Sequence, residues 1–272
     1  MCIDCLHSAS IFSCLDCQSG YWQLEVDETD RPKTAFITKY GLYEYTKMPF
    51  GLCNAPSTFQ RCMELIFRGL QWHTLLIYLD DIIIFSTDHE EHLERLEEVL
   101  YRLKISGLKL KPSKCELLKS EILYLGHIVG KEGIKPNPQI IQSIMEWKVP
   151  CNTKEVQQFL GLCNYYRQFI FKFSDIAAPL SQLTRKDIPF KWTDACQESF
   201  HKLRSALTSA PVLAYPNSED TYILDTDASN IGIGGVLSQI QNNKGRVIAY
   251  ASKKLDRCNS GTASQEKNYW QQ

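Results

Sequence analysis

Two adjacent carboxylates interrupt an otherwise apolar stretch of the chain. Asp80 and Asp81 stand in the middle of residues 75–85, in which every other side chain is aliphatic or aromatic. The flanking residues predict two short buried strands, and the acids predict the turn between them, because Asp is depleted in strands and enriched in turns. A carboxylate buried among apolar neighbours is costly unless a cation compensates its charge, which points to a bound metal ion. A solvated hairpin turn is the alternative for this pair alone.

Asp16 supplies a third acid, at the end of the strand-like segment 12–16. Taken alone, this residue fits a helix cap or a turn. An antiparallel sheet would bring it beside the turn at Asp80 and Asp81. Unit charges about 4 Å apart repel by ~4 kcal/mol at an effective dielectric constant of about 20, so three such acids gather only around divalent cations. A carboxylate cluster that holds two Mg²⁺ ions is the apparatus of phosphoryl transfer in polymerases and nucleases.

The N-terminal cysteines offer a different metal site. Cys2 and Cys5 form one CxxC pair, and Cys14 and Cys17 form a second. Four thiolates at such spacing can hold a tetrahedral Zn²⁺ ion. Neither pair carries the glycine with which zinc knuckles turn, and Cys14 lies within a strand-like segment. The pattern therefore disfavours a zinc module, which stays open as an alternative.

Composition describes an ordinary globular protein. The chain has 272 residues, enough for about two domains, with 44% hydrophobic and 22% charged residues. Its formal net charge of −1 gives no overall signal for a polyanionic partner, although local clusters of charge decide nucleic-acid binding. No apolar run reaches the ~18 residues of a membrane span. With 11 cysteines, an odd number, we expect a soluble intracellular protein, cytoplasmic or nuclear and not secreted.

The elements around the acids follow from local pattern. Alternating runs at 34–38 and 43–45 predict a hairpin. Prolines and a glycine prevent regular structure in the loop 48–56, after which a helix begins at Ser57. An amphipathic helix is predicted for residues 88–105. Its predicted apolar stripe consists of Leu93, Leu96, Val99, Leu100 and Leu103. His89 and His92, in its charged first turn, are predicted to be solvated.

The second half of the chain predicts helices and then strands. A Pro-rich boundary at 135–138 precedes two helices, one over 139–147 and one that opens at Asn152 with Glu155 three residues later, a capping box. Another helix is predicted over 193–207. Three strand-like segments with turn signals between them follow, at 221–229, 232–239 and 246–252.

Three ordered motifs carry a family resemblance. They are Phe12-Ser-x-Leu-Asp16-x-x-Ser-Gly-Tyr21, the stretch Met48-Pro-Phe-Gly-Leu-x-Asn-Ala-Pro56, and Tyr78-Leu-Asp-Asp81. Their order and spacing resemble those of reverse transcriptases, above all the Pol polyprotein of Gypsy-type LTR retrotransposons, over nearly the whole chain. The resemblance implies an α+β fold with a polymerase palm in 1–130, thumb and connection helices in 131–190, and a partial RNase H-like α/β domain in 191–272.

The same resemblance implies roles in the palm. Asp16 and Asp80 would bind two catalytic Mg²⁺ ions, with Asp81 in support. Tyr21 would lie under the sugar of the incoming nucleotide and exclude a 2′-hydroxyl, the group that separates ribonucleotides from deoxynucleotides. Phe50 and Gly51 match the loop that lines the nucleotide pocket. Packing in the hydrophobic core is the alternative for Tyr21 and Phe50.

Further roles are implied after the palm helix. Positive charge suited to a phosphate backbone concentrates at Lys104, Lys109, Lys111 and Lys114. Lys114 matches the family lysine that protonates the leaving pyrophosphate, and a solvated lysine is the alternative. Residues 124–129 read as a strand containing glycine and resemble the primer grip, in which Leu125 and Gly126 would hold the primer end. Arg167 and Lys172, in the thumb and connection, are candidate phosphate contacts, and solvated side chains are the default alternative.

The last region resembles the opening of an RNase H domain. A strand ending in Thr226-Asp227-Ala-Ser precedes a glycine-rich strand, and Asp227 would be the first metal ligand. Residues 265–269 resemble the segment before the next acidic ligand of the family. With one ligand present, we expect no RNase H endonuclease activity from this chain. Because 15 residues precede Asp16, we also expect the basic fingers region to be truncated.

The sequence as a whole predicts an RNA-directed DNA polymerase fragment, a nucleotidyltransferase. Its expected partners are an RNA or DNA template with its primer and deoxynucleoside triphosphates, with no membrane partner. The alternative from a different class is a catalytically dead retroelement remnant that only binds nucleic acid. Intact palm acids favour the enzyme, and the short fingers favour the remnant.

Overall fold

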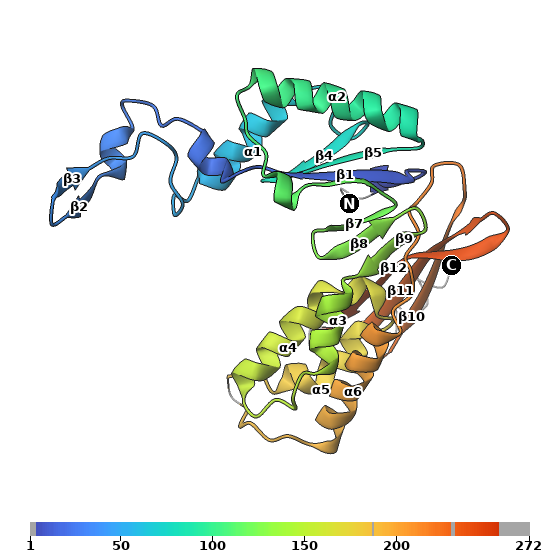
Figure 1. The fold of residues 1–272 in the computed structure, drawn as a ribbon. Helices are drawn as coiled ribbons and strands as arrows, with labels where there is room; N and C mark the ends of the chain where they lie inside the picture. The colour runs from blue at the N-terminus through green and yellow to red at the C-terminus, as the bar shows by residue number, and fades with distance from the viewer. Residues whose placement is uncertain (1–3, 187, 230–231, 256–272) are drawn as a thin grey trace. The chain divides into compact units, whose positions relative to one another are not determined.

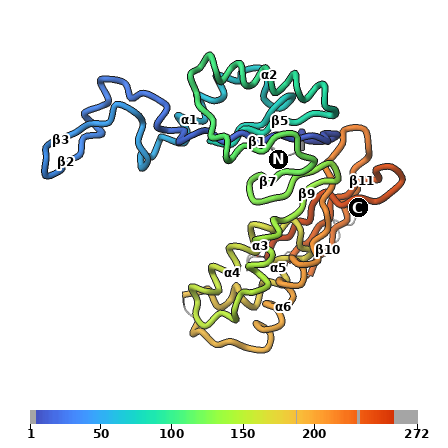
Figure 2. The backbone as a smooth tube through the Cα atoms, in the orientation of Figure 1, coloured from blue at the N-terminus to red at the C-terminus, as the bar shows by residue number. Residues whose placement is uncertain are grey.

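The computed structural model describes residues 4–186, 188–229 and 232–255. The chain divides into two compact units, Met1–Ile122 and Leu123–Gln272 (Figure 1). Figure 2 traces the backbone of both in the same orientation. The chain combines helices with antiparallel sheets, and runs of strands and runs of helices follow one another along it, as the predicted α+β fold requires. Within the described part of the chain, no helix is both long and apolar enough to span a bilayer.

A four-stranded antiparallel sheet forms the centre of the first unit. Its strands lie in the order β4, β5, β1, β6. They span Ile11–Asp16 (β1), Leu75–Tyr78 (β4), Asp81–Ser86 (β5) and Glu116–Lys119 (β6). The neighbouring β1 and β5 pair along their full length, from Ile11 opposite Ser86 to Asp16 opposite Asp81. Nearly every apolar side chain of these two strands is buried, so both strands lie in the core of the unit.

Two helices complete the core of this unit. The helices span Ala55–Ile66 (α1) and His89–Ile105 (α2). One cluster of buried side chains joins Leu15 on β1, Ile82 on β5, Phe59 and Met63 on α1, and Val99 on α2. Burial of that apolar area drives the helices onto the sheet. The ends of β1 and β5 that carry the acids are therefore held by a single core.

Short elements connect these larger ones. A small exposed hairpin pairs β2 (Phe36–Thr38) with β3 (Gly41–Tyr43), as the alternating pattern predicts. The 3₁₀ turns of the unit are Asp4–Leu6 (η1), Gly20–Gln23 (η2), Arg31–Thr34 (η3) and Pro112–Lys114 (η4). Asp88 caps α2, since its side chain accepts a hydrogen bond from the Glu91 backbone N–H at 3.0 Å.

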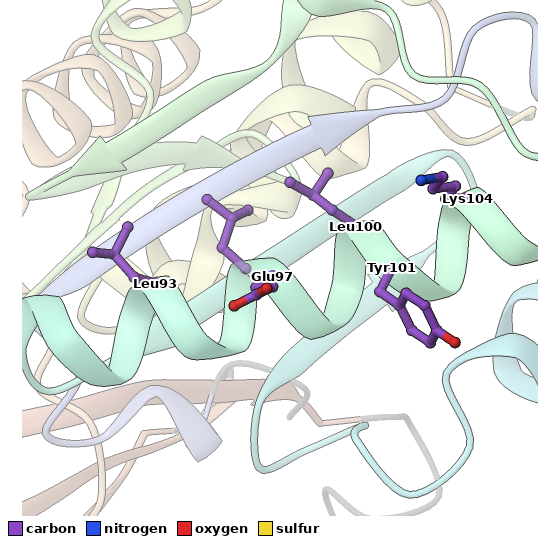
Figure 3. Close-up of a pocket in the computed structure, with 6 residues that line it drawn as sticks. Leu93, Glu97, Leu100, Tyr101 and Lys104 are labelled. Carbon is purple, nitrogen blue, oxygen red and sulfur yellow. The ribbon is translucent and has the colours of Figure 1, made fainter.

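The apolar stripe predicted for α2 is wrong in part. Val99 and Leu103 are buried, but Leu93 and Leu100 are 55% and 42% exposed. His92 takes the place predicted for Leu93 on the buried face, while Val99 and Leu103 keep theirs. The outward-facing side chains line a shallow surface pocket together with Leu96 (Figure 3). They are Leu93, Glu97, Leu100, Tyr101 and Lys104. All belong to one helix, so this pocket is separate from the acids.

His92 is fully buried, which corrects the prediction that it is solvated. The Leu118 backbone N–H donates to Ser13 Oγ at 3.0 Å, and Ser86 Oγ donates to the Asp88 carbonyl at 2.9 Å. The His92 ring lies between these hydroxyls, with Nε2 2.7 Å from Ser13 Oγ and Nδ1 2.8 Å from Ser86 Oγ. Because the Ser86 proton is already used, His92 Nδ1 carries the hydrogen and Nε2 accepts from Ser13. The ring is thus neutral with both nitrogens satisfied.

This arrangement predicts a loss of stability in acid. Burial lowers the pKa of His92 from its ordinary 6.5, so the unfolded chain binds a proton there that the folded chain does not. The stabilisation is complete above about pH 6.5 and declines as the pH falls from that value toward the lowered pKa. We expect the midpoint temperature of thermal unfolding of the first unit to decrease as the pH is lowered from 7 to 5. A ring NMR titration of His92 checks this directly.

The control for this titration is His89→Gln, which removes the exposed neighbouring histidine of the same helix. The acid loss of stability should persist in that variant. A His92 ring signal that titrates above pH 6.5 would contradict the assignment.

The second unit combines helices with two small sheets. Its helices span Pro138–Met145 (α3), Thr153–Tyr165 (α4), Phe173–Gln182 (α5) and Asp194–Thr208 (α6), with a 3₁₀ turn at Arg167–Phe169 (η5). Asn152 caps α4 as predicted, since its side chain accepts from the Glu155 N–H at 3.0 Å, and the Glu155 carboxylate accepts from the Cys151 N–H at 2.7 Å. Aromatic packing joins α4 to α6, where the rings of Phe159 and Phe200 have centroids 4.7 Å apart.

The strands of the second unit form two three-stranded sheets. One contains Glu121–Tyr124 (β7), His127–Gly130 (β8) and Gly133–Pro136 (β9), and the other Tyr222–Ala228 (β10), Gly232–Gln241 (β11) and Lys244–Lys254 (β12). The three strands predicted from 221 to 252 are thus present. The predicted single strand over 124–129 is not, because Leu125 and Gly126 form the turn between β7 and β8.

Candidate active site

Strand pairing brings two of the predicted acids together. Asp16 is the last residue of β1 and lies directly opposite Asp81, the first residue of β5. Residues paired across an antiparallel ladder point to the same face of the sheet. Two like charges at directly opposed positions are destabilising unless something offsets them. The charges of Asp16 and Asp81 therefore repel each other at this end of the two strands.

The turn of the β4–β5 hairpin lies one residue earlier than predicted. Tyr78 and Asp81 are paired, so the loop consists of Leu79 and Asp80, and Asp81 belongs to the strand. Leu79 adopts a left-handed φ of 53°. Its N–H donates to Gln60 Oε1 of α1 at 2.8 Å. Gln60 was not among the predicted site residues, because nothing in the local pattern connects a helix residue to a turn 19 positions later.

Asp80 is held close against its surroundings. The Cys17 N–H donates to its carbonyl at 3.2 Å. Its side-chain Oδ1 is buried and has no hydrogen-bond partner among the residues that the structure describes. Burial, followed by the charges of Asp16 and Asp81, raises the pKa of Asp80. An unsatisfied buried carboxylate oxygen is costly, so this atom calls for a ligand that carries positive charge.

Gly20 makes room for this carboxylate. A β-carbon placed on Gly20 would lie 2.2 Å from Asp80 Oδ1 and 2.8 Å from Cζ of Phe59. Both distances are far below van der Waals contact. Gly20 belongs to the first of the three sequence motifs, but the motif alone does not show that the Asp80 side chain of the β4–β5 turn packs against it. Any larger residue here would displace either the acid or the core ring.

Lys114 lies with the acids. Its ammonium is 3.0 Å from Asp16 Oδ2, and the Asp16 side chain is only 17% exposed. The hydrogen bond to Asp16 and the charge of that carboxylate raise the pKa of Lys114. Burial and then Asp16 likewise raise the pKa of Asp81, while Lys114 lowers it. Lys114, in η4, is thus paired with Asp16, although its own side chain is 56% exposed.

The acids suit a hard divalent cation. Carboxylate oxygens are the ligands that Mg²⁺ prefers, and the buried Oδ1 of Asp80 is unsatisfied. No three His, Cys, Asp or Glu side chains of the described segments already converge as a complete ligand set. The residues fit a metal that also takes oxygens from water and substrate phosphates, which is the usual way that proteins bind Mg²⁺.

The cysteine alternative does not gain support. Cys2 lies outside the described residues. Burial, followed by the charges of Asp81 at Cys14 and Asp80 at Cys17, raises the pKa of both thiols to about 12. Zinc binds the thiolate, so these two groups are poor ligands.

Aromatic rings adjoin the acids. Tyr21, in η2, packs against the core, with its ring centroid 5.6 Å from Phe59 and 5.2 Å from Phe50. Burial and the charge of Asp80 raise the pKa of Tyr21. Phe50 is 61% exposed, so packing in the hydrophobic core does not explain an aromatic residue at this position. Gly51 follows with a φ of 96°, a conformation that favours glycine.

The predicted primer-grip residues, the predicted RNase H ligand and Lys172 lie in the second unit. Leu125 and Gly126 occupy the β7–β8 turn. Asp227, on β10, is 53% exposed and forms an ion pair with Lys172. The hydrogen bond from Lys172 lowers the pKa of Asp227. Lys172 is therefore engaged by a carboxylate. The segment 265–269, predicted to precede a further acid, lies outside the described residues.

Family models match both parts of the chain. Residues 2–129 match the model "Reverse transcriptase (RNA-dependent DNA polymerase)". Residues 192–270 match "RNase H-like domain found in reverse transcriptase". The chain therefore combines a reverse transcriptase domain with an RNase H-like domain.

Relatives specify the kind of reverse transcriptase. The chain is 45% identical over 253 residues to the retrovirus-related Pol polyprotein from transposon 297 of Drosophila melanogaster, covering 92% of this chain and 23% of the relative. It is 34% identical over 253 residues to the transposon Tf2-3 polyprotein of Schizosaccharomyces pombe, covering 93% and 19%. The chain belongs to the reverse transcriptases of retrotransposon Pol polyproteins and spans about a fifth of the relatives' length. The family resemblance predicted from the three motifs is confirmed.

Solved structures show the same fold. The foamy viral protease-reverse transcriptase in complex with double-stranded DNA matches with a TM-score of 0.82 at 26% identity, covering 92% of this chain and 44% of that one. The same viral protein in complex with an RNA/DNA hybrid matches with a TM-score of 0.80 at 25% identity, covering 96% and 36%. The expected palm, helices and RNase H-like domain are thus confirmed as the fold class.

Proposed function

We propose that this chain carries the nucleotide-transfer centre of an RNA-directed DNA polymerase, at the edge of the sheet where Asp16, Asp80 and Asp81 meet. The observation that carries the proposal is the buried, unsatisfied Oδ1 of Asp80 beside two further acids. Two Mg²⁺ ions held by Asp16 and Asp80 would activate the 3′-hydroxyl of a primer and stabilise the oxygen that leaves. Asp81 adds negative charge that favours their binding.

The other residues would bind and orient the substrates. Tyr21 and Phe50 form an aromatic edge beside Asp80, suited to lie under a deoxyribose and to leave no room for a 2′-hydroxyl. Gly51 lets the backbone approach a nucleotide closely. Lys114, with a raised pKa, stays protonated at neutral pH and can donate its proton to a leaving pyrophosphate.

The partners follow from this reaction. We propose that the chain binds an RNA or DNA template with its primer, and deoxynucleoside triphosphates. The solved relatives that hold double-stranded DNA and an RNA/DNA hybrid support this proposal. Leu125 and Gly126 would grip the primer end, and Asp227 would be the first ligand of an RNase H-like metal site. We place the reaction inside the cell, where the 11 cysteines stay reduced.

Primer extension by the full 272-residue chain tests the function. A labelled DNA primer on an RNA template should lengthen in the presence of deoxynucleotides and Mg²⁺. Excess chelator should abolish extension, and added Mg²⁺ should restore it, because the acids need divalent cations. Salt-dependent binding of the duplex without extension at any Mg²⁺ concentration would contradict the polymerase and support a nucleic-acid-binding remnant.

A further inference from the structure

The β7–β8 turn has an unfavourable backbone conformation. Leu125 and Gly126 both lie in the left-handed region, with φ of 44° and 70°. Two successive left-handed residues give the tight turn that matches the twist of a hairpin. Glycine adopts this conformation freely, but leucine does so at a cost, because its β-carbon crowds the carbonyl oxygen. Something outside the turn must therefore stabilise it.

Two consecutive tyrosines supply that stabilisation. Tyr165 ends α4 and Tyr166 follows it. The Tyr165 hydroxyl donates to the carbonyl of Leu125, and the Tyr166 hydroxyl donates to the carbonyl of Gly126 at 2.6 Å. Each carbonyl of the turn thus has its own donor. Tyr166 is completely buried, so water does not compete for its hydrogen bond.

Packing fixes the turn in the same place. The His127 ring stacks on Tyr165 with centroids 5.4 Å apart and an interplanar angle of 9°, and it meets Tyr166 edge-on at 5.3 Å. A β-carbon on Gly126 would lie 3.3 Å from the Tyr165 hydroxyl oxygen. His127 itself is 4% exposed. The turn, the first residue of β8 and the end of α4 therefore form one closely packed group.

We propose that Tyr165 and Tyr166 are positioning residues for the primer terminus. This inference rests on the proposed function, in which Leu125 and Gly126 hold the primer end. Nucleotide transfer requires the 3′-hydroxyl in line with the reacting phosphate, and small displacements lower the rate steeply. By fixing both carbonyls of the turn, the two hydroxyls set the direction in which its backbone meets the primer. They contact the turn and act on the primer through it.

Removal of single hydroxyls tests the inference. We expect Tyr165→Phe and Tyr166→Phe each to lower kcat for extension about fivefold, and the double variant roughly 20-fold, with an unchanged KM for the nucleotide. The matched control is Tyr215→Phe. The Tyr215 hydroxyl also donates to a backbone carbonyl of this sheet, Gly130 at 3.1 Å, but at the β8–β9 turn. The control should lose similar stability and retain kcat.

A fluorescent base at the primer 3′ end provides a readout without catalysis. We expect 2-aminopurine at that position to change its emission on binding to the wild-type chain, and to change less on binding to the double variant at saturating protein. Tyr215→Phe should match the wild type. Equal emission from all variants would overturn the inference, whether or not the wild type extends primers. A wild type that shows the emission change without extension would instead overturn only the polymerase function.

Discussion

Replacing Asp80 with asparagine is expected to slow primer extension by about a thousandfold, which corresponds to ~4 kcal/mol of transition-state stabilisation. Asparagine keeps the shape of the side chain but cannot supply a negative charge to a Mg²⁺ ion. Folding should respond in the opposite direction. Since burial and the neighbouring acids raise the pKa of Asp80, its ionised form opposes folding, and the neutral variant should be at least as stable at pH 7.

Single-turnover extension and thermal unfolding, measured on the same samples, check both halves of this expectation. Asp225→Asn is the matched control, because it neutralises an exposed carboxylate on β10. That variant should extend primers at the wild-type rate. Extension by Asp80→Asn within tenfold of the wild type would show that Asp80 is not a metal ligand.

Replacing Gly20 with alanine is expected to lower extension about a hundredfold, the loss typical of a reacting group displaced by about 1 Å. The added methyl would lie 2.2 Å from Asp80 Oδ1 and 2.8 Å from the Phe59 ring. Since Phe59 is completely buried, the carboxylate is the group that moves. The Mg²⁺ concentration for half-maximal extension should rise as well, because a displaced ligand binds the ion less tightly.

Gly161→Ala provides the comparison for this variant. Gly161 lies within α4, and a β-carbon there meets no heavy atom of the described chain within 4 Å outside its own helix. Alanine at that exposed helical position should stabilise the chain by about 0.5–1 kcal/mol and leave extension unchanged. An unaltered Mg²⁺ requirement in Gly20→Ala, or equal activity in both variants, would contradict the role assigned to Gly20.

Local pattern sufficed for most elements of the fold. Period-two alternation and buried apolar runs predicted β1, β4 and β5, and the cap at Asn152 predicted where α4 begins. These signals reside within a few consecutive residues, so no tertiary information is needed to read them.

The sequence-based predictions were wrong or incomplete where a residue's contacts come from distant parts of the chain. His92 looks like a charged first-turn residue, yet Ser13 and Ser86 supply its hydrogen bonds from two strands. The hairpin turn lies one residue earlier than predicted because Asp81 belongs to β5, where it pairs with Tyr78 and with Asp16. The Gln60 side chain, on α1, accepts a hydrogen bond from the backbone of the hairpin turn. In each case the determining partner lies on another element, which sequence spacing does not reveal.

The same limit applies to the candidate site. Motif order and spacing selected Asp16, Asp80 and Asp81, and the family resemblance selected Lys114. The structure pairs Asp16 with Asp81 across the sheet and places Lys114 3.0 Å from Asp16. The sequence did not indicate that Gly20 borders Asp80 or that tyrosines from α4 fix the β7–β8 turn. Such supporting residues are defined by space and not by order along the chain.

Because Asp16 pairs with Asp81, the register between β1 and β5 determines whether these two acids of the reaction centre lie close together. Successive residues of a strand face opposite sides, so a shift of β1 by one position would send the Asp16 carboxylate to the far face. One inserted or deleted codon within the six residues of β1 would separate the acids even if every motif residue were kept. The coding sequence of this strand should therefore drift by replacement and not by change of length.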